Sequence, residues 1–301
     1  ELLELFTMGV DTYSQEDVEA ASRAFTGYST DGYFTNYLFD HRRGDGEYWL
    51  KNHDFDYKEF MGKGGSFDGD EIIDIILEQD DVANFICEKI YQWFVYEVPD
   101  ENFVNQMATI LRNGNYEIKP VMEYLLTSEH FYDINFRGSQ ILNPVSQILG
   151  LIRKLNLHNM EYPNKYLQRS IGEMGMTLLY PPNVNGWTGH RAWINSITLP
   201  MRKRLSSILI DPDTDQRLKF HINIIELANN LSNPNDPRSL VKDFALVLFG
   251  LPLSENLENK LVEILMDGAA EYDWDINDSG ANYRLKELVK YMLRLPEAQL
   301  A

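Results

Sequence analysis

Apolar residues recur at helical spacing along most of the chain, and this pattern constrains the fold more than any other feature. The clearest stripe comprises Val82, Phe85, Ile86, Ile90, Trp93 and Phe94. Similar stripes lie within residues 104–111, 145–155 and 285–292. Each stripe places its apolar side chains on one face of a helix, and that face must be buried against another element. The sequence therefore predicts a mainly α protein that folds as a compact multi-helix bundle.

One stretch departs from the helical pattern. Residues 33–39 and 47–50 are rich in aromatic residues and are bounded by glycine and aspartate, which is typical of short strands. We therefore expect a small β-hairpin insertion near residues 33–61.

Turn-forming residues are too sparse to mark a flexible linker between domains. We expect residues 1–301 to form a single mostly helical unit, with one candidate sub-boundary at the Asp-Pro-Asp-Thr-Asp sequence of residues 211–215. The chain opens without a methionine, inside the helical pattern of residues 1–6. We therefore expect it to be the C-terminal part of a longer protein whose N-terminal part is missing.

The charge of the chain excludes some partners. Its 27 Lys and Arg residues against 46 Asp and Glu residues give a net charge of −19, which would repel a nucleic-acid backbone. The longest nearly apolar run, residues 244–253, falls far short of the roughly 20 residues that cross a bilayer. We therefore expect no nucleic-acid partner and no transmembrane segment in this fragment.

The familiar motifs of catalysis and of cofactor binding are missing from the sequence. It contains no G-x-S-x-G, no H-E-x-x-H and no phosphate-binding glycine motif. Cys87, the single cysteine, lies in an apolar helical pattern, where we expect a buried thiol. No metal site and no cofactor are predicted.

His53 and Asp54 are the best catalytic candidates in the sequence. An imidazole beside a carboxylate can share a proton or bind a divalent cation, because histidine titrates near neutral pH. The alternative is a solvated histidine beside acidic neighbours. Whether the protein is an enzyme is left open by the residues.

The segment 180–193 is the best binding candidate because it combines prolines, tryptophans and amides in one loop. Its candidate contact residues are Asn183, Asn185, Trp187, His190, Arg191 and Trp193. Aromatic faces with hydrogen-bonding neighbours suit a protein or glycan partner. The alternative is a structural plug with both tryptophans buried. The basic run 202–204 follows, and we expect it to pair with an acidic face or with the missing N-terminal part.

Several segments together resemble a known bacterial family. They are Glu1–Val10, Tyr13–Val18, Ala24–Tyr28, His53 to Gly69, Pro181–Trp187 and Trp193–Ser196. In this order they are similar to the family called domain of unknown function 1800. Tyr28 stands where the family usually has tryptophan, and Thr188-Gly189-His190 replaces its usual Pro-Gly-Gly.

The resemblance implies a bacterial, commonly exported protein of the periplasm, outer membrane or cell surface. It also implies gene neighbours of a sulfatase-like family, and it supplies no reaction. Our first hypothesis is a non-enzymatic binding or assembly component that recognises a protein or glycan partner. A sulfatase-like neighbour protein is one such candidate partner. The second is a hydrolase of an envelope polymer that uses His53 and nearby acids, with or without a metal.

Overall fold

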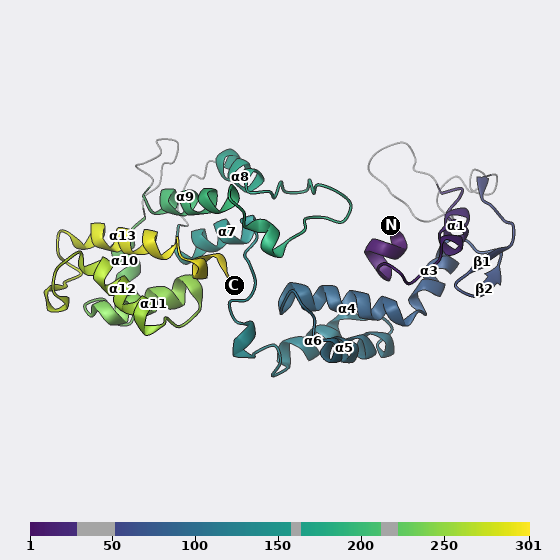
Figure 1. Ribbon diagram of the computed structural model, residues 1–301, viewed down its shortest axis with the longest axis horizontal. Coiled ribbons are helices and arrows are strands. Elements are labelled where there is room, and N and C mark those ends of the chain that lie inside the picture. The colour runs from purple at the N-terminus through teal and green to yellow at the C-terminus, as the bar shows by residue number, and fades with distance from the viewer. Residues whose placement is uncertain (29–51, 158–163, 212–221) are drawn as a thin grey trace. The chain divides into compact units, whose positions relative to one another are not determined.

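The computed structural model describes residues 1–28, 52–157, 164–211 and 222–301 (Figure 1). The chain divides into two compact units, Glu1–Phe131 and Tyr132–Ala301. The described residues are mainly helical with a small antiparallel hairpin, which confirms the predicted fold class. The single-unit organisation stays a prediction. Of the candidate sub-boundary, Asp211 lies in the second unit, and residues 212–215 fall outside the described residues.

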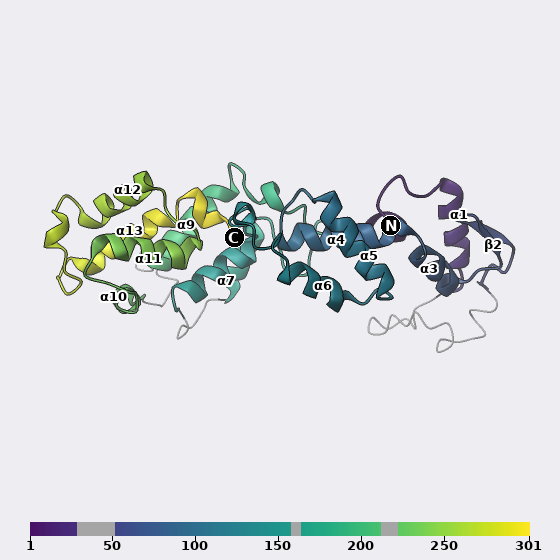
Figure 2. The ribbon, with the colours of Figure 1, turned by 90° about the horizontal axis from the view of Figure 1, so that it is seen from below.

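Helices make up most of the first unit. After a π-helical turn at Leu2–Thr7 they are α1 (Gln15–Ala24), α3 (Gly69–Leu77), α4 (Asp80–Phe94), α5 (Glu101–Asn113) and α6 (Ile118–Thr127). Ser14 and Asp68 begin α1 and α3 with full capping boxes, in which side chains satisfy backbone N–H groups at the helix start. In Figure 2, α4, α5 and α6 lie side by side, and α5 packs against both of the others. Of the apolar stripe predicted on α4, Val82 is fully buried, whereas Trp93 and Phe94 at its C-terminal end are exposed, so the predicted stripe is buried only in part.

A two-stranded hairpin connects to α3 in this unit. Strands β1 (Lys58–Phe60) and β2 (Lys63–Gly65) pair antiparallel, with Phe60 opposite Lys63. The two turn residues, Met61 and Gly62, both have positive φ (47° and 75°), as a type I′ turn requires. A small hairpin is thus confirmed, although its strands are not those expected: residues 33–39 and 47–50 lie outside the described residues.

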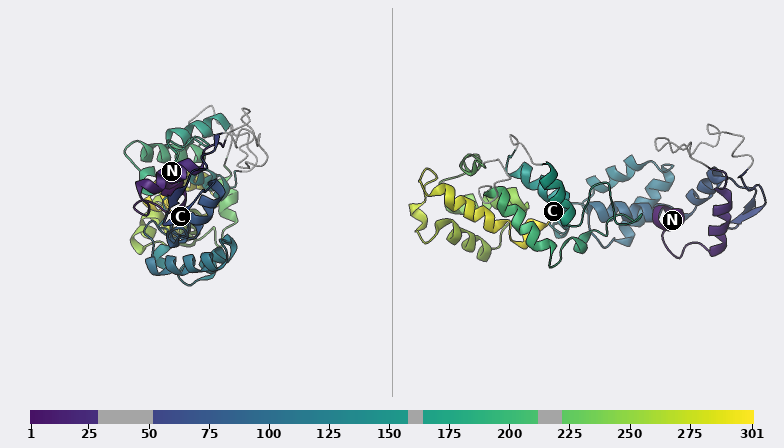
Figure 3. Two further views of the ribbon diagram at one scale, coloured as in Figure 1. Left: turned by 90° about the vertical axis from the view of Figure 1, so that its right-hand side faces the viewer. Right: turned by 90° about the horizontal axis from the view of Figure 1, so that it is seen from above.

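Helices of the second unit enclose a larger core. They are α7 (Pro144–Lys154), α8 (Asn164–Glu173), α9 (Thr198–Ile210), α10 (Ile224–Asn229), α11 (Pro237–Phe249), α12 (Glu255–Met266) and α13 (Ala281–Met292). Short 3-10 turns lie at Ile134–Phe136, His190–Trp193, Glu271–Asp273 and Pro296–Gln299. In Figure 3, α13 (yellow) lies beside α12 (yellow-green). Leu285, Leu288 and Met292 on α13 are fully buried.

Cys87 on α4 is fully buried, as expected, and burial raises the pKa of its thiol to about 12, so the thiol is protonated at neutral pH. None of the helices in the described part of the chain is both long enough and apolar enough to cross a membrane.

Candidate functional site

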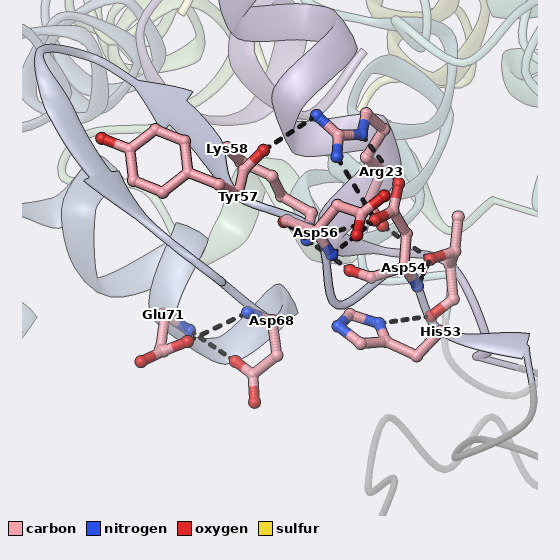
Figure 4. A network of polar contacts seen from close by, with 9 residues as sticks. Arg23, His53, Asp54, Asp56, Tyr57, Lys58, Asp68 and Glu71 are labelled. Carbon is pink, nitrogen blue, oxygen red and sulfur yellow. Dashed lines mark hydrogen bonds and ion pairs between the residues drawn. The ribbon is translucent and has the colours of Figure 1, made fainter.

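Asp54 is bonded to an arginine from α1. Arg23 Nε lies 2.7 Å from Asp54 Oδ2, and Arg23 Nη2 lies 3.3 Å from Asp54 Oδ1 (Figure 4). Arg23 Nη1 also donates to the carbonyl oxygen of Tyr57 at 3.2 Å. The guanidinium thus holds both carboxylate oxygens and the backbone that follows them.

This pairing changes the acid–base behaviour of Asp54. The hydrogen bond from Arg23, followed by that from the backbone N–H of Asp56, lowers the pKa of Asp54 to about 2. A general base works best with a pKa near the operating pH. Asp54 is therefore a weak base at neutral pH, and its carboxylate serves to bind Arg23.

Lys58 fills the inside of the loop formed by residues 54–58. Its side chain is fully buried, and its ammonium donates to the carbonyl oxygens of Asp54 and Asp56, the latter at 3.0 Å. Asp54 Oδ1 lies 3.9 Å from the same nitrogen. The ammonium therefore satisfies two backbone carbonyl oxygens and lies close to one carboxylate oxygen.

His53 forms a hydrogen bond with the chain just after α1. It is buried, and its Nδ1 lies 3.0 Å from the carbonyl oxygen of Thr26, to which it must donate because a carbonyl only accepts. The rings of His53 and Phe55 pack edge to face, with their centroids 4.6 Å apart. Thr26 Oγ1 accepts from the backbone N–H of Asp54 at 2.8 Å. The structure thus brings His53 and Asp54 to one place, and each serves to join residues 53–58 to α1.

Sequence reasoning missed Arg23 and Lys58. Both are ordinary basic residues in sequence. The partner of Arg23 lies 31 positions later in the chain, and Lys58 is buried because it lies on the inner face of β1. Within the described ranges, no three His, Cys, Asp or Glu side chains are grouped so that they could hold a metal ion.

The binding candidate lies in the second unit, in a segment that we name the 178–197 loop, between α8 and α9. Two of its side chains are strongly exposed: Leu179 at 94% and Tyr180 at 80%. Val184 and Ile197 are exposed as well. Sequence reasoning missed Leu179, because an apolar residue after a helix is ordinarily expected to be buried.

The predicted contact residues differ in exposure. Asn183, Asn185 and Arg191 are exposed, Trp187 and His190 are half-buried, and Trp193 is only 8% exposed. A Cβ on Gly175 would lie 4.0 Å from the Trp193 ring, so this ring packs beside the chain that leaves α8. Trp193 therefore anchors the loop to its own unit.

Local hydrogen bonds fix the shape of this loop. Asn183 Oδ1 accepts from the backbone N–H of Asn185 at 3.0 Å, and Thr198 Oγ1 donates to the carbonyl oxygen of Trp193 at 2.8 Å. Leu179 and His190 have positive φ (61° and 45°), which costs free energy in residues with a Cβ. The 178–197 loop thus holds an exposed leucine in an unfavourable backbone conformation.

The basic run 202–204 divides in the structure. Arg202 is fully buried, and its three guanidinium nitrogens have no hydrogen-bond partner in the described part of the chain. Burial lowers the pKa of Arg202 to about 10, so it stays charged at neutral pH. Lys203 is half-buried and Arg204 exposed, so the three residues form no common surface.

The two candidate sites lie in different units: His53 and Asp54 belong to the first unit, and the 178–197 loop belongs to the second. No curated protein and no solved structure matches the chain. The sequence model of one family, described as a protein of unknown function (DUF1800), matches residues 1–300, and the chain therefore belongs to that family.

Proposed function

We propose that this protein is an exported or cell-envelope component that binds a partner rather than catalysing a reaction, and that the 178–197 loop makes the contact. One observation carries the proposal. Leu179 is almost fully exposed and adopts a left-handed backbone conformation, so the fold gains neither burial nor local stability from this leucine.

The surroundings of Leu179 favour a preformed contact. The loop is anchored by buried Trp193 and by the hydrogen bond from Thr198, so little conformational entropy would be lost on binding. Tyr180, which follows Leu179, adds an amphipathic ring of the kind enriched at interfaces. A partner that covered both side chains would remove apolar surface from water.

A protein partner fits this loop better than a glycan. Its exposed side chains include the aliphatic residues Leu179, Val184 and Ile197, whereas sugars stack on aromatic rings. Trp193, which could have offered a second such ring, is buried. The family resemblance implies an exported location, and it suggests a first partner to test: a sulfatase-like protein of the kind whose genes often neighbour those of the family.

The test measures binding of the purified sulfatase-like protein to the immobilised chain by biolayer interferometry. We compare Leu179→Ser and Tyr180→Ser with Tyr272→Ser, a matched control at an 89% exposed tyrosine in the same unit. At least a tenfold loss of affinity in the two loop variants, with the control unchanged, supports the proposal. Equal binding by all variants contradicts it.

A second arm separates the two kinds of partner. The chain is sedimented with isolated cell-wall glycan, and the bound fraction is compared for the same variants. Glycan binding that depends on Tyr180 and not on Leu179 would replace the protein partner by a glycan. Fractionation of cells that produce the full-length protein tests its exported location.

A further inference from the structure

The second unit contains a pocket of about 420 Å³ between α8 and α9. Its volume lies within the range of small-molecule sites. The floor is apolar and includes the buried side chains of Met174, Leu205 and Ile208. This floor would bury the apolar part of a ligand.

Basic side chains line the same pocket. Lys165 and Arg169 come from α8, and Arg204 comes from α9. Arg169 is paired with Glu173, the carboxylate in the lining, at 2.8 Å. Lys165 and Arg204 are exposed and make no ion pair within the described residues. The pocket therefore has two uncompensated positive charges in a chain whose net charge is −19.

We propose that this pocket binds a single-chain amphiphilic anion, such as a fatty-acid carboxylate. The anionic head would lie between Lys165 and Arg204, and the alkyl chain would lie on Met174, Leu205 and Ile208. An anion alone would leave the apolar floor exposed to water, and a neutral apolar molecule would leave the two cations unpaired. An amphiphilic anion satisfies both parts of the lining.

This site does not depend on the proposed partner of the 178–197 loop. The pocket is lined by α8 and α9, and neither Leu179 nor Tyr180 lines it. A variant that loses partner binding at the loop can therefore still be tested for ligand binding in the pocket, and the reverse also holds. Arg202 also lies on α9, but its side chain does not line the pocket, so its buried charge is separate from this site.

The experiment titrates the full chain by calorimetry with octanoate, dodecanoate, octanol and inorganic phosphate. Octanoate should bind at least tenfold tighter than octanol, because the carboxylate pairs with the two cations. Dodecanoate should bind at least tenfold tighter than octanoate, because its added methylenes are buried on the floor. Inorganic phosphate that binds as tightly as dodecanoate, or dodecanoate that gives no binding up to 1 mM, would overturn the proposal.

Charge reversal locates the binding. Arg204→Glu and Lys165→Glu should each weaken dodecanoate binding at least tenfold, and both positions are exposed, so the fold should tolerate them. Lys203→Glu is the matched control, since it makes the same charge change beside Arg204 and outside the lining. Equal affinities for Arg204→Glu and Lys203→Glu would place the ligand elsewhere and overturn the proposal.

Discussion

Arg23 on α1 binds both carboxylate oxygens of Asp54, a residue 31 positions later in the chain. The pair joins a helix to the loop before β1, and Lys58 and Thr26 form further hydrogen bonds with the same loop. A histidine beside an aspartate therefore belongs here to a structural junction. The hydrolase hypothesis gains no support from this geometry.

The first prediction concerns the pH dependence of this junction. The pKa of Asp54 is about 2 in the folded protein and about 3.9 in an unfolded chain, so the unfolded state binds more protons between these values. The stabilisation is complete above pH 4–5 and is lost as the pH falls through about 2. The stability difference between wild type and Asp54→Asn, measured by urea unfolding, should be constant from pH 7 to pH 5 and shrink from pH 4 to pH 2.

Glu59→Gln is the control for this series. Glu59 is exposed on β1 and forms no ion pair among the described residues. Its substitution should leave the pH profile of the wild type unchanged. A difference between wild type and Asp54→Asn that stays constant down to pH 2 would contradict the assigned role of Arg23.

The second prediction concerns Lys58. Replacing it by methionine keeps the length of the side chain but leaves two carbonyl oxygens without their donor. Lys58→Met should lower the free energy of unfolding by about 2–4 kcal/mol, measured by urea unfolding. Lys63→Met, at an exposed lysine paired with Glu78, should change it by no more than about 0.5 kcal/mol. Equal effects would show that the buried ammonium is not needed to hold residues 54–58.

The helices were predictable because their signals are local. The stripe at 82–94 lies within α4, and Ser14 with Asp17 forms the capping box that begins α1. The junction around Asp54 was not predictable, because no local pattern pairs Arg23 with residue 54. The burial of Trp193 and the exposure of Leu179 depend on how the loop leaves α8, which composition does not encode.

The third prediction concerns the buried charge of Arg202. A guanidinium without a partner destabilises the folded state, because burial removes its hydration. Arg202→Met should raise the free energy of unfolding by about 1–3 kcal/mol, measured by urea unfolding at neutral pH. Lys203→Met, at the half-buried neighbour, should change it by no more than about 0.5 kcal/mol. A loss of stability in Arg202→Met would show that the guanidinium has a partner in solution.

The fourth prediction separates stability from binding at Leu179. Its φ of 61° is unfavourable for leucine and freely adopted by glycine. Leu179→Gly should therefore keep or raise the free energy of unfolding, by up to about 1 kcal/mol, while it weakens partner binding at least tenfold. The measurements are urea unfolding and biolayer interferometry on the same samples.

Leu178→Gly supplies the contrast for this substitution. Leu178 is less exposed than Leu179 and is not among the residues with positive φ, so glycine there should lower the free energy of unfolding by about 0.5–1 kcal/mol. A residue that stabilises its own fold loses stability when it is truncated, whereas a residue kept for a partner loses binding alone. If Leu179→Gly lost as much stability as Leu178→Gly, the leucine would serve the fold, and the contact would have to lie elsewhere on the loop.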